Sequence, residues 1–558
     1  MKAATITITL FGTSKIRRVI NSKQIKLKIM RRLSFKAQLL SLVAVCGITM
    51  VFTACTNEDV AQNAKNNDEV KGLTTFTTGE EATTRTSMDN SGAFYWEAGD
   101  KIYVKDDENH WQVSSNAPTS KTASFRFKVP GKYTKGNTYE IYYPGKNGYQ
   151  DQVTISASQT QTKPNSTAHF GEAGDCGTAT ASWSAAQNGY AFKLDHQAAY
   201  LIFQPYISNT KLDDCYLTKI EVSSDNDITD TYKLDTTTGA LTGGSGTGKQ
   251  IVITTKGSES YANGFHLNVT SANVATNGTF MVIKPGTHNL TIKYWIKDVK
   301  TKVEGVITKV LNTTFVKNKY YNITADLKVT DYDGDHYYMW DAQQQCWFGY
   351  EWTKNLSIGI GQPTVNNNTS SNYPASISDA RYFNPYYPGA LISNPATRNP
   401  LFKTLPNANE LSWYVLKGDP RWDDVKLWTV MGHLYKGGMW FLKKENIQHF
   451  SKEHAPDGVT DLRSRNVVYD NYTLTSGIPN SIDITKYFYL PALGMYGKRN
   501  TLDPTGLGTL TEVGVSGHYW SSSAYPVPSG LAYGMGLSKG HVGVSGYLRG
   551  AGIRAKAF

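Results

Sequence analysis

Short runs in which apolar and polar residues alternate, each closed by a turn signal, recur through residues 73–330. Phe125-Arg-Phe-Lys-Val129 ends at Pro130-Gly131, and Tyr139-Glu-Ile-Tyr-Tyr143 ends at Pro144-Gly145. A side-chain period of two is typical of a β-strand with one buried face, and Pro-Gly pairs break strands. Turn signals that recur about every 8–12 residues are typical of β-sandwiches. The pattern predicts a mostly-β protein.

Changes in residue pattern divide the chain into three folded regions. We predict a first β-sandwich at 73–195 and a second at 196–330, because strand-like runs continue through both. The remainder, 331–558, holds eight of the twelve Trp and the one clear helical pattern, Asn407 to Lys417. Asn407 suits the N-cap of that helix, and Gly418 suits its end. We expect an α+β domain there, with long loops of the kind that carry binding sites.

The net charge of the chain is concentrated at its start. Lys and Arg number 57 against 46 Asp and Glu, a formal charge of +11. Residues 1–54 contribute ten of the basic residues and no acid, so the other 504 residues carry 47 − 46 = +1. This near-neutral balance excludes nucleic-acid binding founded on overall charge.

Residues 1–54 have the layout of an export leader. Arg31, Arg32 and Lys36 are followed by the 14-residue apolar run Leu39 to Phe52. That run is shorter than the ~20 residues of a membrane-spanning helix and suits a signal peptide. Met30 begins a leader of ordinary length, so we expect it to be the true start. Residues 55–72 are polar and predict a disordered linker.

Small residues stand directly before Cys55, in the order Phe52-Thr-Ala-Cys55. This resembles a bacterial lipobox, which predicts cleavage before Cys55 and attachment of lipid to it. The acids of Thr56-Asn-Glu-Asp59 resemble the surface-export signal of Bacteroidetes lipoproteins. We therefore expect a lipoprotein at the outer membrane and cell surface of a Gram-negative, Bacteroidetes-like bacterium. An ordinary signal peptide that happens to contain Cys55 is the alternative.

Three cysteines remain after the leader and the lipidated residue: Cys176, Cys215 and Cys346. They allow at most one intramolecular disulfide, and buried free thiols are the favoured state. The absence of any Cys-x-x-Cys pair excludes a zinc site of that type.

Three further motifs fail as functional sites. Gly243 to Lys249 fits a phosphate loop, but Gln250 replaces the required Ser or Thr and a strand-like run follows. His449 and His454 lack the spacing of a metalloprotease, and Asp331 to Asp335 lacks the last acid of an EF-hand. A loose calcium site at Asp331 to Asp335 stays open. We find no catalytic arrangement and expect no enzyme, no metal and no cofactor.

Aromatic residues are the positive signal in the last domain. Trp413, Trp440 and Trp520 are candidates for ligand binding, because indole faces stack on sugars. Core packing is the competing interpretation for each of them.

Two stretches of the predicted sandwiches resemble known proteins. Thr84-Arg-Thr86 with Phe94-Tyr-Trp-Glu-Ala-Gly-Asp-Lys-Ile102, and Val316 to Leu327, resemble the opening and the close of Bacteroidales fimbrillins. The resemblance covers about residues 73–330. It implies two transthyretin-like β-sandwiches, a lipoprotein precursor, and assembly with other pilin subunits by donor-strand exchange.

The last domain resembles a different family. Pro406 to Tyr414, Met431 to Phe441, Gly517 to Ser523 and Arg549 to Arg554 resemble the Fibrobacter-type major paralogous domains, which are similar to the C-type-lectin-like fold. Calcium-dependent lectins of that superfamily use Glu-Pro-Asn or Gln-Pro-Asp together with Trp-Asn-Asp. Here Thr364 follows Gln362-Pro363 and no Trp-Asn-Asp occurs, so calcium-dependent sugar binding is not expected.

The fimbrillin resemblance implies a proteolytic step. Residues 73–78 would be the first strand, and Arg85, in the loop after it, would be the processing site. A pilus subunit that ends in a folded domain would accept a strand without donating one, which places it at the tip with 331–558 as the adhesive part. The alternative is a permanently anchored, monomeric surface lipoprotein. Its ligand, whether host, bacterial or glycan, is open under both interpretations.

Overall fold

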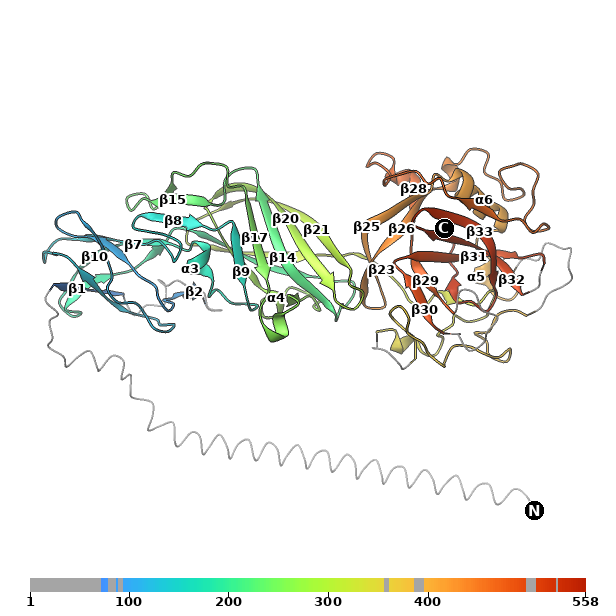
Figure 1. Cartoon of the computed structure of the whole chain (residues 1–558), viewed down its shortest axis with the longest axis horizontal. Helices are drawn as coiled ribbons and strands as arrows, with labels where there is room; N and C mark the ends of the chain where they lie inside the picture. Colours follow the sequence, from blue (N-terminus) through green and yellow to red (C-terminus); the bar gives the residue numbers. More distant parts are fainter. Residues whose placement is uncertain are drawn as a thin grey trace, which may run out of the picture. The chain divides into compact units, whose positions relative to one another are not determined.

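The computed structural model describes residues 72–78, 87–88, 94–355, 361–385, 396–497, 508–527 and 530–558. These residues form many strands in several sheets and few, short helices (Figure 1). The contacts divide the chain into two compact units, Met1–Leu73 and Thr74–Phe558. The prediction of a mostly-β protein is confirmed, and the assignment of its parts to transthyretin-like and C-type-lectin-like folds stays a prediction.

The first sheet has the order β5-β4-β7-β10-β11-β1-β6, and β12 also pairs with β10. Its strands are β1 (Leu73–Thr78), β4 (Tyr103–Lys105), β5 (Trp111–Val113), β6 (Arg126–Pro130), β7 (Tyr139–Tyr143), β10 (Gly177–Ser184), β11 (Gly189–Phe192) and β12 (Asp195–His196). A separate ribbon joins β2 (Ser87–Met88) to β3 (Phe94–Tyr95). The runs at 73–78, 125–129 and 139–143 therefore form strands as predicted.

Part of the first predicted region belongs to the second set of sheets. Strand β8 (Gln152–Ile155) pairs with β15 (Asp230–Leu234), and β9 (Ser158–Gln161) pairs with β17 (Gln250–Thr255). The short helix α3 (Phe170–Ala173) places Phe170 in the same core. The chain thus enters the second core, leaves it through β10, and returns after residue 195.

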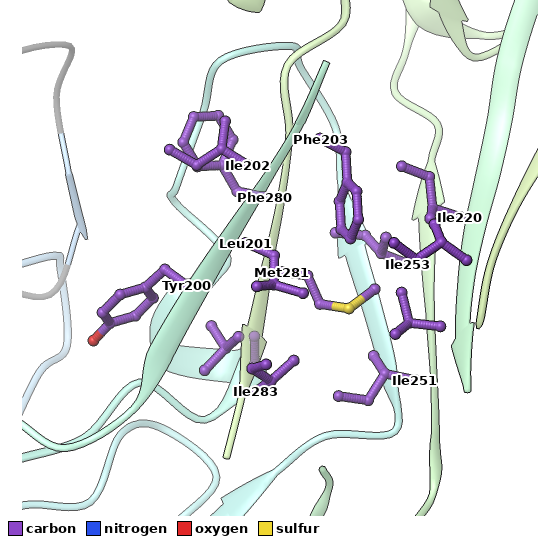
Figure 2. Close-up of a cluster of buried hydrophobic side chains, with 14 of the residues drawn as sticks. Tyr200, Leu201, Ile202, Phe203, Ile220, Ile251, Ile253, Phe280, Met281 and Ile283 are labelled. Atoms are coloured by element: carbon purple, nitrogen blue, oxygen red, sulfur yellow. The ribbon is translucent and has the colours of Figure 1, made fainter. Parts of the chain in front are cut away.

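The second set of sheets encloses the largest core. One sheet has the order β19-β13-β22 and another the order β21-β20-β14-β17-β9, with β18 on β14. Its further elements are β13 (Ala199–Tyr206), β14 (Cys215–Ser224), β16 (Leu241–Thr242), β18 (Phe265–His266), α4 (Val274–Asn277), β19 (Thr279–Ile283), β20 (Gly286–Asp298), β21 (Glu304–Phe315) and β22 (Tyr320–Asp326). In Figure 2, Leu201, Phe203 and Met281 of β13 and β19 face Ile220 and Ile253 of β14 and β17.

The C-terminal region contains two main sheets and the predicted helix. The sheets have the orders β23-β25-β26-β28 and β24-β34-β31-β32-β33-β27, and β29 and β30 pair beside β31. The strands are β23 (Thr330–Tyr332), β24 (Tyr337–Tyr338), β25 (Arg421–Val430), β26 (His433–Leu442), β27 (Tyr469–Asn471), β28 (Tyr487–Pro491), β29 (Leu493–Tyr496), β30 (Leu510–Val513), β31 (Ser516–Ala524), β32 (Leu531–Ser538), β33 (His541–Leu548) and β34 (Ile553–Arg554).

Helix α6 (Ala408–Lys417) has the predicted ends. Asn407 and Glu410 form a reciprocal capping box, and Gly418 is the C-cap. Leu411, Tyr414 and Val415 of this helix are buried in the core of the domain, as the helical spacing predicted.

The start of β26 joins the C-terminal region to the second core. Leu434 is fully buried among the side chains of that core. Its backbone N–H donates to Asp298 Oδ2 at 3.0 Å, and its carbonyl accepts from Thr301 Oγ1 at 2.8 Å. His433 Nδ1 also lies 3.2 Å from Asp298 Oδ2.

The structure also shows the surroundings of the cysteines and of the glycine-rich segment. Cys176, Cys215 and Cys346 are buried and free, as favoured. Gln250 begins β17 directly after the glycine-rich segment, and Ser245 of that segment donates to Asp230, so the segment is a turn between strands. Within the described residues, no helix is long and apolar enough to span a membrane, and no group of three or more His, Cys, Asp or Glu side chains could hold a metal.

Candidate functional site

Strand β1 occupies a slot in the first sheet between β11 and β6. It runs parallel to β11, with Phe76 opposite Tyr190 and Thr78 opposite Phe192. On its other side, Thr78 N–H donates to the carbonyl of Phe125 at 3.2 Å, and Phe125 N–H donates to Thr78 Oγ1 at 3.0 Å. Because it is paired on both sides, removal of β1 would leave unpaired backbone groups on two neighbours.

Both faces of β1 are buried from Thr75 to Thr78, although four of its six residues are Thr. Phe76 is 0 % exposed and enters the core of the first sheet. On the other face, Thr75 Oγ1 accepts a hydrogen bond from Lys128 Nζ at 2.9 Å. A Cβ at Gly189 would lie 2.6 Å from the Thr75 carbonyl oxygen, so glycine is needed there for β1 to come this close.

The Phe76 ring lies among three tyrosines. It stacks on Tyr190 with ring centroids 5.1 Å apart and planes at 19°. Tyr133 and Tyr139 present their rings edge-on, at 5.1 Å and 6.4 Å. Offset-stacked and edge-to-face pairs are the favourable aromatic geometries. We call these three tyrosines the tyrosine cage.

The tyrosines of the cage are neutral at pH 7, as any tyrosine with an ordinary pKa is, and burial moves their pKa values further from neutrality. It raises the pKa of Tyr190 to about 12 and the pKa of Tyr133 further, and it also raises the pKa of Tyr139. Asp107 accepts hydrogen bonds from Thr134 and Tyr139, which hold the pKa of its carboxyl below the usual range. At neutral pH the tyrosines are therefore hydroxyl donors, and Asp107 is an ionised acceptor.

Two sequence-predicted sites lie outside the described residues. These are Cys55, the predicted lipid attachment site, and Arg85, the predicted processing site. Arg85 lies seven residues after the end of β1, in the segment that leads to β2.

The three candidate ligand-binding tryptophans are buried and do not form one surface. Trp413, Trp440 and Trp520 are 6 %, 8 % and 0 % exposed. Their indole N–H groups donate to the His454 carbonyl, to Asp423 and to the Tyr338 carbonyl. A sugar needs an exposed ring face for stacking, so their placement indicates packing and does not support the prediction that they bind ligand.

Other aromatic residues of the C-terminal region are exposed. Trp352 is 71 % exposed and Phe348 is 52 % exposed, both within one loop. Sequence reasoning did not single them out. The available signal was that they stand on the two sides of Gly349, outside any alternating run.

No family model matches the chain, and no curated protein matches it. Solved structures give distant likenesses. A fimbrial protein from Bacteroides ovatus ATCC 8483 is 12% identical, with 86% of this chain and 98% of that chain covered at a TM-score of 0.25. A fimbrial assembly protein from Parabacteroides distasonis ATCC 8503 is 11% identical, with 46% and 92% covered at a TM-score of 0.22.

A third likeness is to the tip fimbrial protein Mfa3 from Porphyromonas gingivalis with C-terminal truncation. It is 10% identical, with 45% of this chain and 95% of that chain covered at a TM-score of 0.23. Similarity at TM-scores this low does not define a shared fold or function, so the function of this chain rests on its own residues.

Proposed function

We propose that this chain is a surface lipoprotein of the fimbrillin type that becomes the tip subunit of a pilus. In this proposal β1 is removed by proteolysis, another pilin subunit supplies a strand in its place, and the C-terminal region mediates adhesion. The role is one of assembly and binding, without catalysis.

The observation that carries the proposal is the placement of β1. It is a six-residue strand at the start of the first sheet, buried on both faces and paired on both sides. A strand that lies between two neighbours in this way can be replaced by another strand while both neighbours keep their places in the sheet. Arg85 lies in the segment after it, where a single cut would separate β1 from the rest of the chain.

Strand replacement follows from ordinary β-sheet chemistry. Loss of β1 would expose the backbone groups of β11 and the apolar floor that Phe76 now covers. An extended peptide that adds at such a site gains main-chain hydrogen bonds, and its alternate side chains fill the pockets. Both kinds of interaction are possible here, because β1 already forms main-chain hydrogen bonds with β11 and already buries Phe76 in the core.

The last described residues pack inside the C-terminal region. Phe558 pairs its ring with Tyr414, Phe488 and Tyr519 inside the C-terminal region. Strand β34 pairs with β24 and β31. These residues are part of a folded core, so they are not available as a strand for another subunit.

The proposed anchor is lipid on Cys55, which would hold the precursor at the outer membrane before processing. Replacement of Cys55 by Ala is expected to abolish labelling by a radioactive or alkyne-tagged fatty acid and to release the precursor from membranes. Retained labelling in Cys55→Ala would refute the anchor.

The processing step is tested by N-terminal sequencing of the mature protein from sheared surface fibres and from outer membranes. We expect a start at Thr86 in the fibres. The variant Arg85→Ala should stay full length, whereas Lys101→Ala, which removes an exposed basic residue after the segment, should be trimmed normally.

Three results would contradict parts of the proposal. Normal trimming of Arg85→Ala would exclude Arg85 as the processing site. A lipid-blocked Cys55 found only in membranes, with no trimmed form in fibres, would instead favour a permanently anchored, monomeric surface lipoprotein. Uniform labelling of the C-terminal region along fibre shafts would exclude the tip position.

A further inference from the structure

We propose that the β1 slot selects for a donated strand with one aromatic residue at the place of Phe76 and a small, β-branched residue on each side of it. The inference rests on the proposed strand replacement and specifies the chemistry of the partner strand. It is carried by the tyrosine cage, by the packing around Thr75, and by the unpartnered hydroxyl of Thr77.

The tyrosine cage is a site for a ring and not for apolar bulk alone. Tyr190 meets the face of Phe76 and Tyr133 meets it edge-on, both at 5.1 Å between centroids. Each close aromatic pair adds a favourable contribution beyond the burial of its area. A branched aliphatic side chain would fill similar space and lose both pairs.

The walls of the cage are held by bonds that do not involve β1. Tyr190 Oη donates to the Thr134 carbonyl at 2.8 Å, and Tyr133 Oη donates to the Pro130 carbonyl at 3.1 Å. Tyr139 Oη donates to Asp107 Oδ1 at 2.5 Å and accepts from Thr134 N–H at 2.7 Å. The cage is thus positioned before a strand enters, and a preorganised site favours the side chain that fits it.

The tyrosines also support one another. Tyr139 is edge-on to both Tyr133, at 4.9 Å, and Tyr190, at 5.0 Å. These contacts would persist when Phe76 leaves, so the cage is expected to keep its shape while the slot is empty.

The residues beside Phe76 are restricted in size, and at Thr75 the hydroxyl also accepts a hydrogen bond from Lys128 Nζ at 2.9 Å. Thr75 lies against Gly189, where a Cβ would already meet its backbone, and is 9 % exposed. Thr77 is 6 % exposed, and its hydroxyl has no hydrogen-bond partner among the described residues. A buried hydroxyl without a partner is unfavourable, so valine should fit the Thr77 position at least as well as threonine.

The test uses the precursor chain, which still contains β1, with a specific protease site inserted between Thr78 and Ser87. After folding, the chain is cut and incubated in mild denaturant with a fluorescent peptide of residues 71–80. Binding is measured by anisotropy, and release of the original strand by mass spectrometry. Competing peptides carry Phe76→Leu, Phe76→Ala or Thr77→Val.

We expect the native peptide to enter the cut chain. The Phe76→Leu peptide should bind about 10-fold more weakly, from the loss of two ring pairs. The Phe76→Ala peptide should bind at least about 100-fold more weakly. The Thr77→Val peptide should bind as tightly as the native one or more tightly.

Variants of the protein supply a second measurement. Tyr133→Leu should remove about half of the preference for Phe over Leu in the peptide, on a logarithmic scale, because it removes one of the two close ring pairs. Tyr149→Leu alters a tyrosine that is 64 % exposed and lies outside the cage, so it should leave the preference unchanged.

The outcomes separate this inference from the function on which it rests. Equal binding of the Phe and Leu peptides would overturn the aromatic selection while strand replacement stands. Weaker binding of the Thr77→Val peptide would overturn the size argument at that position. Failure of the native peptide to enter a chain that has been cut would overturn strand replacement itself.

Discussion

Protonation of His169 is expected to weaken the contact between α3 and β19. The imidazole Nε2 lies 2.9 Å from the carbonyl oxygen of Phe280. A carbonyl can only accept, so Nε2 carries the proton and Nδ1 has none in the neutral ring. Burial, which penalises the charged ring, lowers the pKa of His169 to about 4.

The direction of the effect follows from linkage. An unfolded histidine takes up a proton below pH ~6.5, whereas the folded one resists it until pH ~4. The stability that His169 contributes is therefore complete above the unfolded pKa and is lost as the pH falls toward the folded pKa. If the whole pKa difference contributes, the free energy of unfolding falls by about 2 kcal/mol between pH 7 and pH 5. Because the residue is only half-buried, solvent screening reduces the expected loss to about 1–2 kcal/mol.

Hydrogen exchange read by peptide mass spectrometry can detect this loss locally. Amides of α3 and β19 in the wild type should lose about 1–2 kcal/mol of protection from pH 7 to pH 5, relative to His169→Gln at each pH. Glutamine can still donate to the Phe280 carbonyl but does not titrate. His110→Gln, which replaces a histidine with a 70 % exposed side chain, is the matched control. Parallel pH profiles for wild type and His169→Gln would refute the reasoning.

Two further changes test the packing of the C-terminal region. Asn407→Ala removes the capping box of α6 and should cost about 0.5–2 kcal/mol in urea unfolding followed by exchange of α6 amides; an unchanged α6 would show that the cap is dispensable. Leu434→Ala should cost about 2–5 kcal/mol, because it opens a cavity in the second core, and proteolysis between residues 327 and 335 should accelerate. Val425→Ala, at a position 76 % exposed, is its control and should change neither measurement.

The sequence predicted those features that depend only on residues close together in the chain. Residues 73–78 form β1 with the predicted ends, and α6 begins and ends at the predicted caps. Strand and helix periodicity and capping chemistry depend on near neighbours, so they can be read from a single stretch of chain.

Pairing between distant strands was not predicted, because periodicity gives the face of a strand and not its neighbours. Strands β8 and β9 look like continuations of the first sheet in the sequence, yet they pair with β15 and β17. The burial of both faces of β1 was hidden for a related reason. Threonine counts as polar in an alternating pattern, although its methyl group packs well inside a sheet.

The candidate site was predicted only in part. The sequence pointed to β1 as a removable strand, but the tyrosine cage is assembled from Tyr133, Tyr139 and Tyr190, which lie more than fifty residues downstream. Tryptophans chosen for ligand binding proved to be buried, because the sequence of a loop does not tell which aromatic rings turn inward.

The seating of Leu434 determines how mechanical load would travel through the molecule. A flexible tether between two domains transmits tension but no torque, and relative motion is the usual behaviour of linked domains. Here the start of β26 is fixed to the second core by the side chain of Leu434 and by the hydrogen bonds of its backbone to Asp298 and Thr301. A force applied to the C-terminal region, such as drag from flowing liquid, would therefore be transmitted directly to β20. The packing of the large second core would then resist the bending of that strand.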